Sequence, residues 1–111
     1  MKREFVYVSN FEKKWRCLGL TEDHLWNLEN YIMENPTSAV TMRGTGGLRK
    51  LRWAIPGYGK SGSVRILYVD IILGSKVFMI DLFIKNEKAN LSKAECNAIK
   101  QVIERIKEEL K

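Results

Sequence analysis

Unopposed positive charge is the feature of this sequence most suited to chemistry. The stretch between Asn35 and Val69 has no Asp or Glu, although the chain holds 13 of them and carries a net charge of +6. The same stretch contains these basic residues: Arg43, Arg49, Lys50, Arg52, Lys60 and Arg65. Positive charge gathered in one glycine-rich segment is typical of a surface that binds polyanions, most often nucleic acid. The alternative is a solvated basic surface that only keeps the protein soluble.

Alternation along a predicted strand over residues 48–55 places two of these cations together. Lys50 and Arg52 are two residues apart, so both side chains emerge from one face of the sheet. Leu51 and Trp53 have the other parity and are expected to point to the core. The strand therefore presents a pair of cations on its open face.

The other cations lie at the ends of the predicted strands and are expected to complete a cleft. Arg49 has the opposite parity from Lys50, but it stands at the strand start, where the chain can twist it outward. Arg65 begins the neighbouring strand. The remaining members lie between those strands and beyond the last one: Lys60, Lys85 and Lys88.

A cleft of cations can cleave RNA without a metal ion. Attack of a 2′-hydroxyl on the adjacent phosphate needs a base, an acid and cations that stabilise the charged transition state. The planar guanidinium of arginine suits phosphate oxygens, and a lysine whose pKa is lowered by neighbouring cations can transfer a proton. The alternative for each residue is a phosphate contact without chemistry.

Other chemistries lack their residues in this chain. There is no phosphate-binding glycine loop of the nucleotide-binding kinds, and no metal-binding cluster or cofactor is expected. Cys17 and Cys96 are far apart and predicted to be reduced, packed thiols. His24 falls in the first turn of a predicted helix, where an exposed structural role is expected rather than catalysis. Asp70 and Asp81 are the acids of the strand region and are expected to make structural hydrogen bonds.

The elements that position these residues are predicted in the order β-α-α-β-β-β-α. Strands are expected over 4–8, 48–55, 64–72 and 77–84, with the last three forming an antiparallel meander. Helices are expected from Asn10 to near Gly19, from Thr21 to Asn35, and from Ser92 to the C-terminus, the first and last opened by capping boxes that begin at Ser9 and Ser92. The sequence predicts an α+β fold, one domain over residues 1–111, in which helices pack on a small antiparallel sheet.

The location of the protein is predicted from the absence of long apolar runs. No stretch approaches the roughly 18 residues needed to span a bilayer. The first residues also lack the apolar stretch of a signal peptide. A cytoplasmic protein without a membrane partner is therefore expected.

Three blocks of sequence resemble the HigB branch of the RelE/ParE toxins. They are the run from Gly46 to Trp53 (GGLRKLRW), the run from Gly59 to Tyr68 (GKSGSVRILY) and the run from Phe83 to Ser92 (FIKNEKANLS). The resemblance covers nearly the whole chain, and the three blocks in this order are fairly specific, whereas any one alone is weak.

The resemblance implies a microbial RNase fold and the toxin of a type II toxin–antitoxin pair. Toxins of this kind enter the A site of the 70S ribosome and cut mRNA there by 2′-hydroxyl attack, which leaves a 2′,3′-cyclic phosphate. The implied partner is a cognate antitoxin, a small helix-turn-helix protein. We expect an acidic or aromatic segment of it to cover the basic face.

The resemblance also implies roles for individual residues. Arg65, which opens the R-x-x-Y strand, matches the residue that binds the scissile phosphate and its transition state. Lys50 and Arg52 match a pair of basic residues, one of them a candidate general base, and Lys88 matches a charge stabiliser or acid. Further RNA contacts are expected from Arg43, Arg49, Lys60 and Lys85. RelE members place a tyrosine in the C-terminal segment, but here no tyrosine follows Tyr68.

Two alternatives remain open at this point. One is a ParE-like toxin that inhibits gyrase on the same fold, although that activity does not require clustered cations. The other is a non-catalytic RNA-binding module, in which Trp53 and Tyr58 stack on bases. Because Trp53 shares its parity with Leu51, core packing is the favoured role for that ring.

Overall fold

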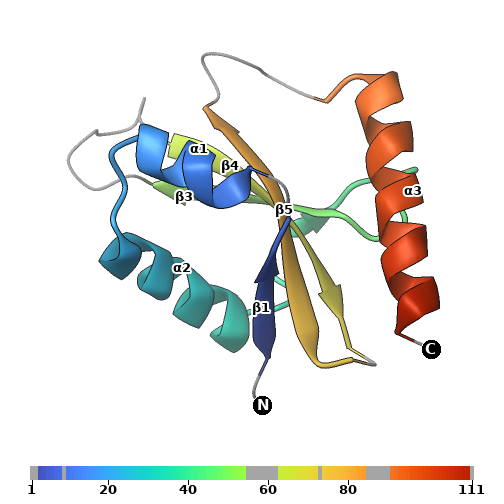
Figure 1. Ribbon diagram of the computed structural model, residues 1–111, viewed down its shortest axis with the longest axis horizontal. Helices are drawn as coiled ribbons and strands as arrows, with labels where there is room; N and C mark the ends of the chain where they lie inside the picture. The colour runs from blue at the N-terminus through green and yellow to red at the C-terminus, as the bar shows by residue number, and fades with distance from the viewer. Residues whose placement is uncertain (1–2, 9, 55–62, 73, 85–90, 111) are drawn as a thin grey trace.

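The computed structural model describes residues 3–8, 10–54, 63–72, 74–84 and 91–110. Its elements follow the chain as β1 (Glu4–Tyr7), α1 (Phe11–Cys17), α2 (Glu22–Glu34), β2 (Val40–Thr41), β3 (Arg49–Ala54), β4 (Ser63–Ile71), β5 (Lys76–Ile84) and α3 (Lys93–Glu109) (Figure 1). The predicted order is confirmed, with the two-residue strand β2 as an addition. Two residues are too few to show the alternating pattern that predicts a strand.

The sheet has the strand order β1-β5-β4-β3-β2. Strands β3, β4 and β5 form the predicted antiparallel meander. β1 instead pairs in parallel with β5, so the sheet is mixed rather than wholly antiparallel. Parallel neighbours require a crossover connection, and here everything from α1 to β4 lies between the two strands in the chain.

Helices cover both faces of this sheet and form two cores. α1 and α2 lie on one side and α3 on the other (Figure 1). The core under α1 and α2, here the first core, consists mainly of these residues: Phe11, Trp15, Leu28, Ile32, Leu51, Val64, Ile66, Tyr68, Val77, Met79 and Leu82. The core under α3, here the second core, consists of these: Leu48, Leu67, Val69, Ile71, Ile80 and Ile103. β4 supplies buried side chains to both cores, as its two apolar faces predicted.

Capping side chains begin two of the helices as predicted. The hydroxyls of Thr21 and Ser92 each accept a hydrogen bond from the backbone N–H three residues later. At α2 the reciprocal bond is accepted by the ring Nδ1 of His24, at 3.1 Å from the backbone nitrogen of Thr21. The capping box predicted for α1 begins at Ser9, which lies outside the described residues, and Asn10 occupies the N-cap position without a side-chain cap bond.

The glycine-rich turn before β3 is tied to α3. Gly44, Gly46 and Gly47 have φ values of +72°, +78° and +115°, which side chains with a Cβ rarely adopt. The carbonyl of Gly46 accepts a hydrogen bond from Lys107 Nζ at 2.7 Å, and the buried hydroxyl of Thr45 bonds to the backbone on both sides of the turn. This part of the basic segment has a structural role, because it docks β3 against the last helix.

None of the helices in the described ranges is long and apolar enough to cross a membrane.

Candidate functional site

Three of the predicted cations share one face of the sheet, the face that carries the second core. On β3, Leu51 is buried in the first core under α1 and α2, so Lys50 and Arg52 project from the opposite face. On β4, Ile66 belongs to the first core and Leu67 to the second, so Arg65 projects on the same side as Lys50. The structure therefore brings Lys50, Arg52 and Arg65 together as the sequence predicted.

Arg52 and Arg65 are directly opposite each other across β3 and β4. Directly opposed side chains have Cβ atoms about 4.5–5.5 Å apart, and like charges in this arrangement destabilise a sheet. Arg65 is half-buried, and its Nη1 donates to Ser63 Oγ at 3.3 Å. Among the residues that the structure describes, no carboxylate forms an ion pair with either arginine. A phosphate group bound between them would supply the negative charge that this pair lacks.

Arg49, a predicted RNA contact, lies on the other side of the sheet from Lys50, Arg52 and Arg65 and bonds to the backbone. Its Nη1 donates to the carbonyl oxygen of Ala39 at 2.8 Å and to that of Thr37 at 3.4 Å. Arg49 pairs with Thr41 of β2 and with Tyr68 of β4, so its backbone has a neighbouring strand on each side. The expected outward twist therefore does not occur, and the side chain follows the parity of its strand.

We expect Arg49→Ala to reduce stability and to leave RNA affinity unchanged in the folded protein. Loss of the bonds from the guanidinium to backbone carbonyls should lower the free energy of unfolding by about 1.5–3 kcal/mol. Urea titration measures the first quantity, and binding of a labelled single-stranded RNA measures the second. A loss of RNA affinity as large as that of Arg65→Ala would contradict this assignment.

The remaining predicted cations fall into two groups. Arg43 is exposed in the turn that precedes β3, beyond the opposite end of that strand from Arg52, and the structure does not bring it to the arginine pair. The other predicted contacts lie outside the described residues: Lys60, Lys85 and Lys88. Tyr58 also lies outside them.

The acids of the strand region have structural partners, as predicted. Asp70 forms an ion pair with Arg3 at 2.7 Å, in which the two side chains are only 6% and 7% exposed. Asp81 pairs with Lys14 at 2.6 Å and also accepts a hydrogen bond from the backbone N–H of Leu82. Both carboxylates are engaged, so neither Asp70 nor Asp81 is a free base for the cation cluster.

Two aromatic side chains considered in the sequence belong to the first core. The ring of Trp53 packs there, with its centroid 5.3 Å from that of Tyr31, which confirms core packing over base stacking. Tyr68 is fully buried, and its hydroxyl donates to the carbonyl of Pro36. Burial raises the pKa of Tyr68 to about 12, against the opposing effect of Arg49. Tyr68 therefore does not replace the missing C-terminal tyrosine as an acid.

Thiols and metal ligands give no second site in the described part of the chain. Cys17 and Cys96 are free, as expected, but Cys17 is exposed rather than packed, because it faces outward at the end of α1. No group of three or more potential metal ligands gathers among the described residues. His24 is used as a helix cap, which agrees with the structural role predicted for it.

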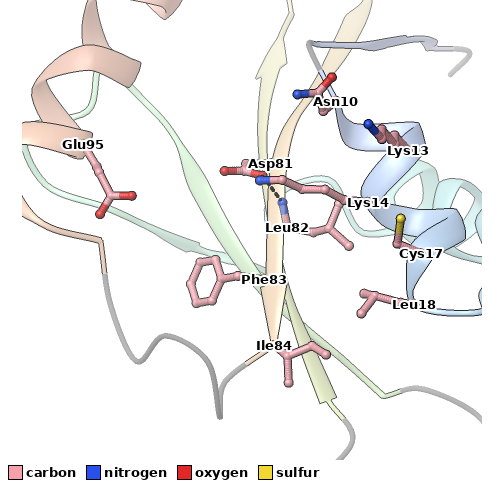
Figure 2. Close-up of a pocket in the computed structure, with 10 residues that line it drawn as sticks. All are labelled: Asn10, Lys13, Lys14, Cys17, Leu18, Asp81, Leu82, Phe83, Ile84 and Glu95. Carbon is pink, nitrogen blue, oxygen red and sulfur yellow. Dashed lines mark hydrogen bonds and ion pairs between the residues drawn. The ribbon is translucent and has the colours of Figure 1, made fainter.

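A groove of about 700 Å³ lies between α1, the end of β5 and the start of α3 (Figure 2). Its lining includes Lys13 and Lys14 from α1, Phe83 from β5 and Glu95 from α3. The sequence interpretation missed Phe83, although this residue is paired with Arg65 across the sheet. Only the register of β4 and β5 reveals that neighbour.

The fold and the paired arginines define a small α+β protein with clustered cations on one face of its sheet. Residues 6–110 match the family described as the RelE toxin of the RelE/RelB toxin–antitoxin system. The chain belongs to this family, and so to the toxins of toxin–antitoxin systems.

A solved structure is similar in fold. It is the E. coli toxin RelE in the free state, in a form with two arginine-to-alanine substitutions. The TM-score is 0.60 at 23% sequence identity, over 80% of this chain and 90% of that one. This likeness supports the α+β arrangement of a five-stranded sheet with three helices.

Proposed function

We propose that this protein is a single-domain, HigB-type toxin that cuts mRNA on the ribosome and is silenced by a cognate antitoxin. Membership of the RelE toxin family supports the toxin role. The observation that carries the nuclease proposal is the opposed pair Arg52 and Arg65, two arginines without an ion-pair partner among the described residues. The cut follows attack of a 2′-hydroxyl on the adjacent phosphate.

The proposed roles follow from where each side chain lies. Arg65 is half-buried and held by Ser63, so its guanidinium is pre-oriented to bind the scissile phosphate and the transition state. Arg52 is exposed across from it and binds a second oxygen of the same phosphate. Lys50, two residues before Arg52 and on the same face of the sheet, is the candidate base. Lys88, by its family resemblance, is the candidate acid or charge stabiliser.

The proposed partner is a small helix-turn-helix antitoxin that covers the cationic face. An acidic segment placed there neutralises the opposed arginines and blocks RNA at the same time. The proposed substrate is mRNA in the A site of the 70S ribosome. The ribosome orients the RNA, which agrees with the engagement of both strand carboxylates, Asp70 and Asp81, in ion pairs.

The test is primer extension on a defined mRNA incubated with purified toxin, with and without programmed ribosomes. We expect new 5′ ends only when ribosomes are present, and a 2′,3′-cyclic phosphate on the upstream product. Cuts on free RNA at the same rate would make the protein a general nuclease. Growth arrest in cells without cuts in either mixture would direct attention to gyrase, with the cationic face as a binding surface.

A further inference from the structure

Phe83 lies in line with the two arginines. Across the three central strands Arg52 is opposite Arg65, and Arg65 is opposite Phe83. All three side chains are on the face that carries the second core, because Phe83 packs partly against that core under α3. Directly opposed positions place Cβ atoms about 4.5–5.5 Å apart, so the ring is the immediate neighbour of the Arg65 side chain.

A bulge in β5 is the reason that Phe83 is on this face. Leu67 pairs with Asp81, but Tyr68 pairs with Met79, so Ile80 is an extra residue in β5. Before the bulge, Met79 points to the first core, and after it Leu82 does. The extra residue reverses the alternation and turns Phe83 toward the arginines.

The ring is both anchored and accessible. It is half-buried, it contacts the second core, and it also lines the groove of about 700 Å³ (Figure 2). The groove is within the size range of small-molecule sites. On its far wall, Asn10 and Lys13 of α1 are exposed and offer hydrogen-bond donors. Figure 2 shows the ring pointing away from α1, toward the side of the groove where Glu95 of α3 lies. An anchored aromatic ring next to the arginines has the chemistry of a nucleotide subsite.

We propose that Phe83 is a stacking platform for the nucleobase next to the phosphate that Arg52 and Arg65 bind. The ligand is single-stranded RNA, and the inference rests on the proposed nuclease function. The base stacks on the ring and enters the groove, while its phosphate lies over the neighbouring guanidinium groups. Because every base has a π-face, this contact orients the nucleotide with little sequence preference of its own.

The test compares Phe83→Leu with Phe78→Leu. Phe78 is a matched control, since it is on the same strand, is half-buried and packs against the same core, but is opposite Val69 rather than an arginine. We expect Phe83→Leu to lower kcat/KM for cleavage on programmed ribosomes about tenfold, the size of one stacking contact. Phe83→Trp should restore activity, and Phe78→Leu should cleave like the parent.

A second readout tests contact directly. An mRNA with 5-iodouridine at the cleaved codon, irradiated on the ribosome with toxin, should crosslink to Phe83 in the parent and not in Phe83→Leu. Equal cleavage by the parent and Phe83→Leu, or an equal loss in Phe78→Leu, would overturn the stacking role. If the parent cuts nothing, the proposed nuclease function fails. In that case, crosslinking of Phe83 to a 5-iodouridine oligonucleotide supports base stacking on Phe83, and the absence of a crosslink overturns it.

Discussion

Arg65→Ala is expected to lower the rate of mRNA cleavage on programmed ribosomes by about 100- to 1,000-fold. This is the usual effect of removing one pre-oriented donor from the charge that develops in a transition state. Arg65 meets that description because it is half-buried and its Nη1 is bonded to Ser63 Oγ. The side chain therefore does not need to be ordered when the phosphate arrives. Single-turnover primer extension measures the rate.

Two further variants show whether shape or charge is responsible. Arg65→Lys keeps the charge but loses the planar fork, so we expect a rate between those of the parent and the alanine variant. Arg105→Ala removes an exposed arginine from α3 and should cleave like the parent. Because Arg65 makes no ion pair among the described residues, its loss should leave the urea midpoint nearly unchanged. A fully active Arg65→Ala protein would show that the phosphate role is wrong.

The largest effect on stability is expected from Asp70→Ala, at about 3–5 kcal/mol in the free energy of unfolding. The carboxylate receives two hydrogen bonds from Arg3, at 2.7 Å from Nε and 3.3 Å from Nη2. Both side chains are more than nine-tenths buried. Removing one member of a buried pair leaves the other charge without this counterion in a poorly solvated place, which is strongly destabilising. Urea unfolding followed by circular dichroism measures the loss.

The controls for this prediction separate burial from charge. Glu4→Ala breaks the exposed pair with Lys76, whose N–O distance is 3.0 Å, and should cost less than about 1 kcal/mol. Replacing both buried partners with apolar residues, as Arg3→Met with Asp70→Leu, should recover most of the stability that the single variant loses. If Asp70→Ala and Glu4→Ala cost the same, the buried pair does not have the importance assigned to it.

Local sequence patterns were sufficient to predict the secondary-structure elements and part of the candidate site. The β3–β4–β5 meander follows from short connections between strands of alternating or continuous apolar character. Side-chain parity alone placed Lys50 and Arg52 on one face, opposite Leu51. Ser92 and Thr21 marked helix starts because capping depends only on residues within one turn. These properties depend on neighbours in the chain, so the sequence contains them directly.

The partners of these elements depended on contacts between distant residues. The alternation of side chains along the strand favoured a position for Arg49 on the same face as Leu51, but its place at the strand start suggested an outward twist. Pairing of Arg49 with both β2 and β4 keeps its side chain on the face of Leu51. The sequence indicated that the glycine-rich turn belongs to a basic binding segment. Its hydrogen bond from Lys107 shows that the turn docks against α3. No local pattern reports such a contact.

The sequence by itself determined the class of elements, the cationic character of one sheet face and the resemblance to RelE-type toxins. Only the tertiary structure decided that Arg52, Arg65 and Phe83 form one row. The reason is the bulge at Ile80, which reverses the alternation of β5 and becomes visible only when that strand is paired with β4. Register is a property of two strands together, so neither strand's sequence specifies which residues become neighbours.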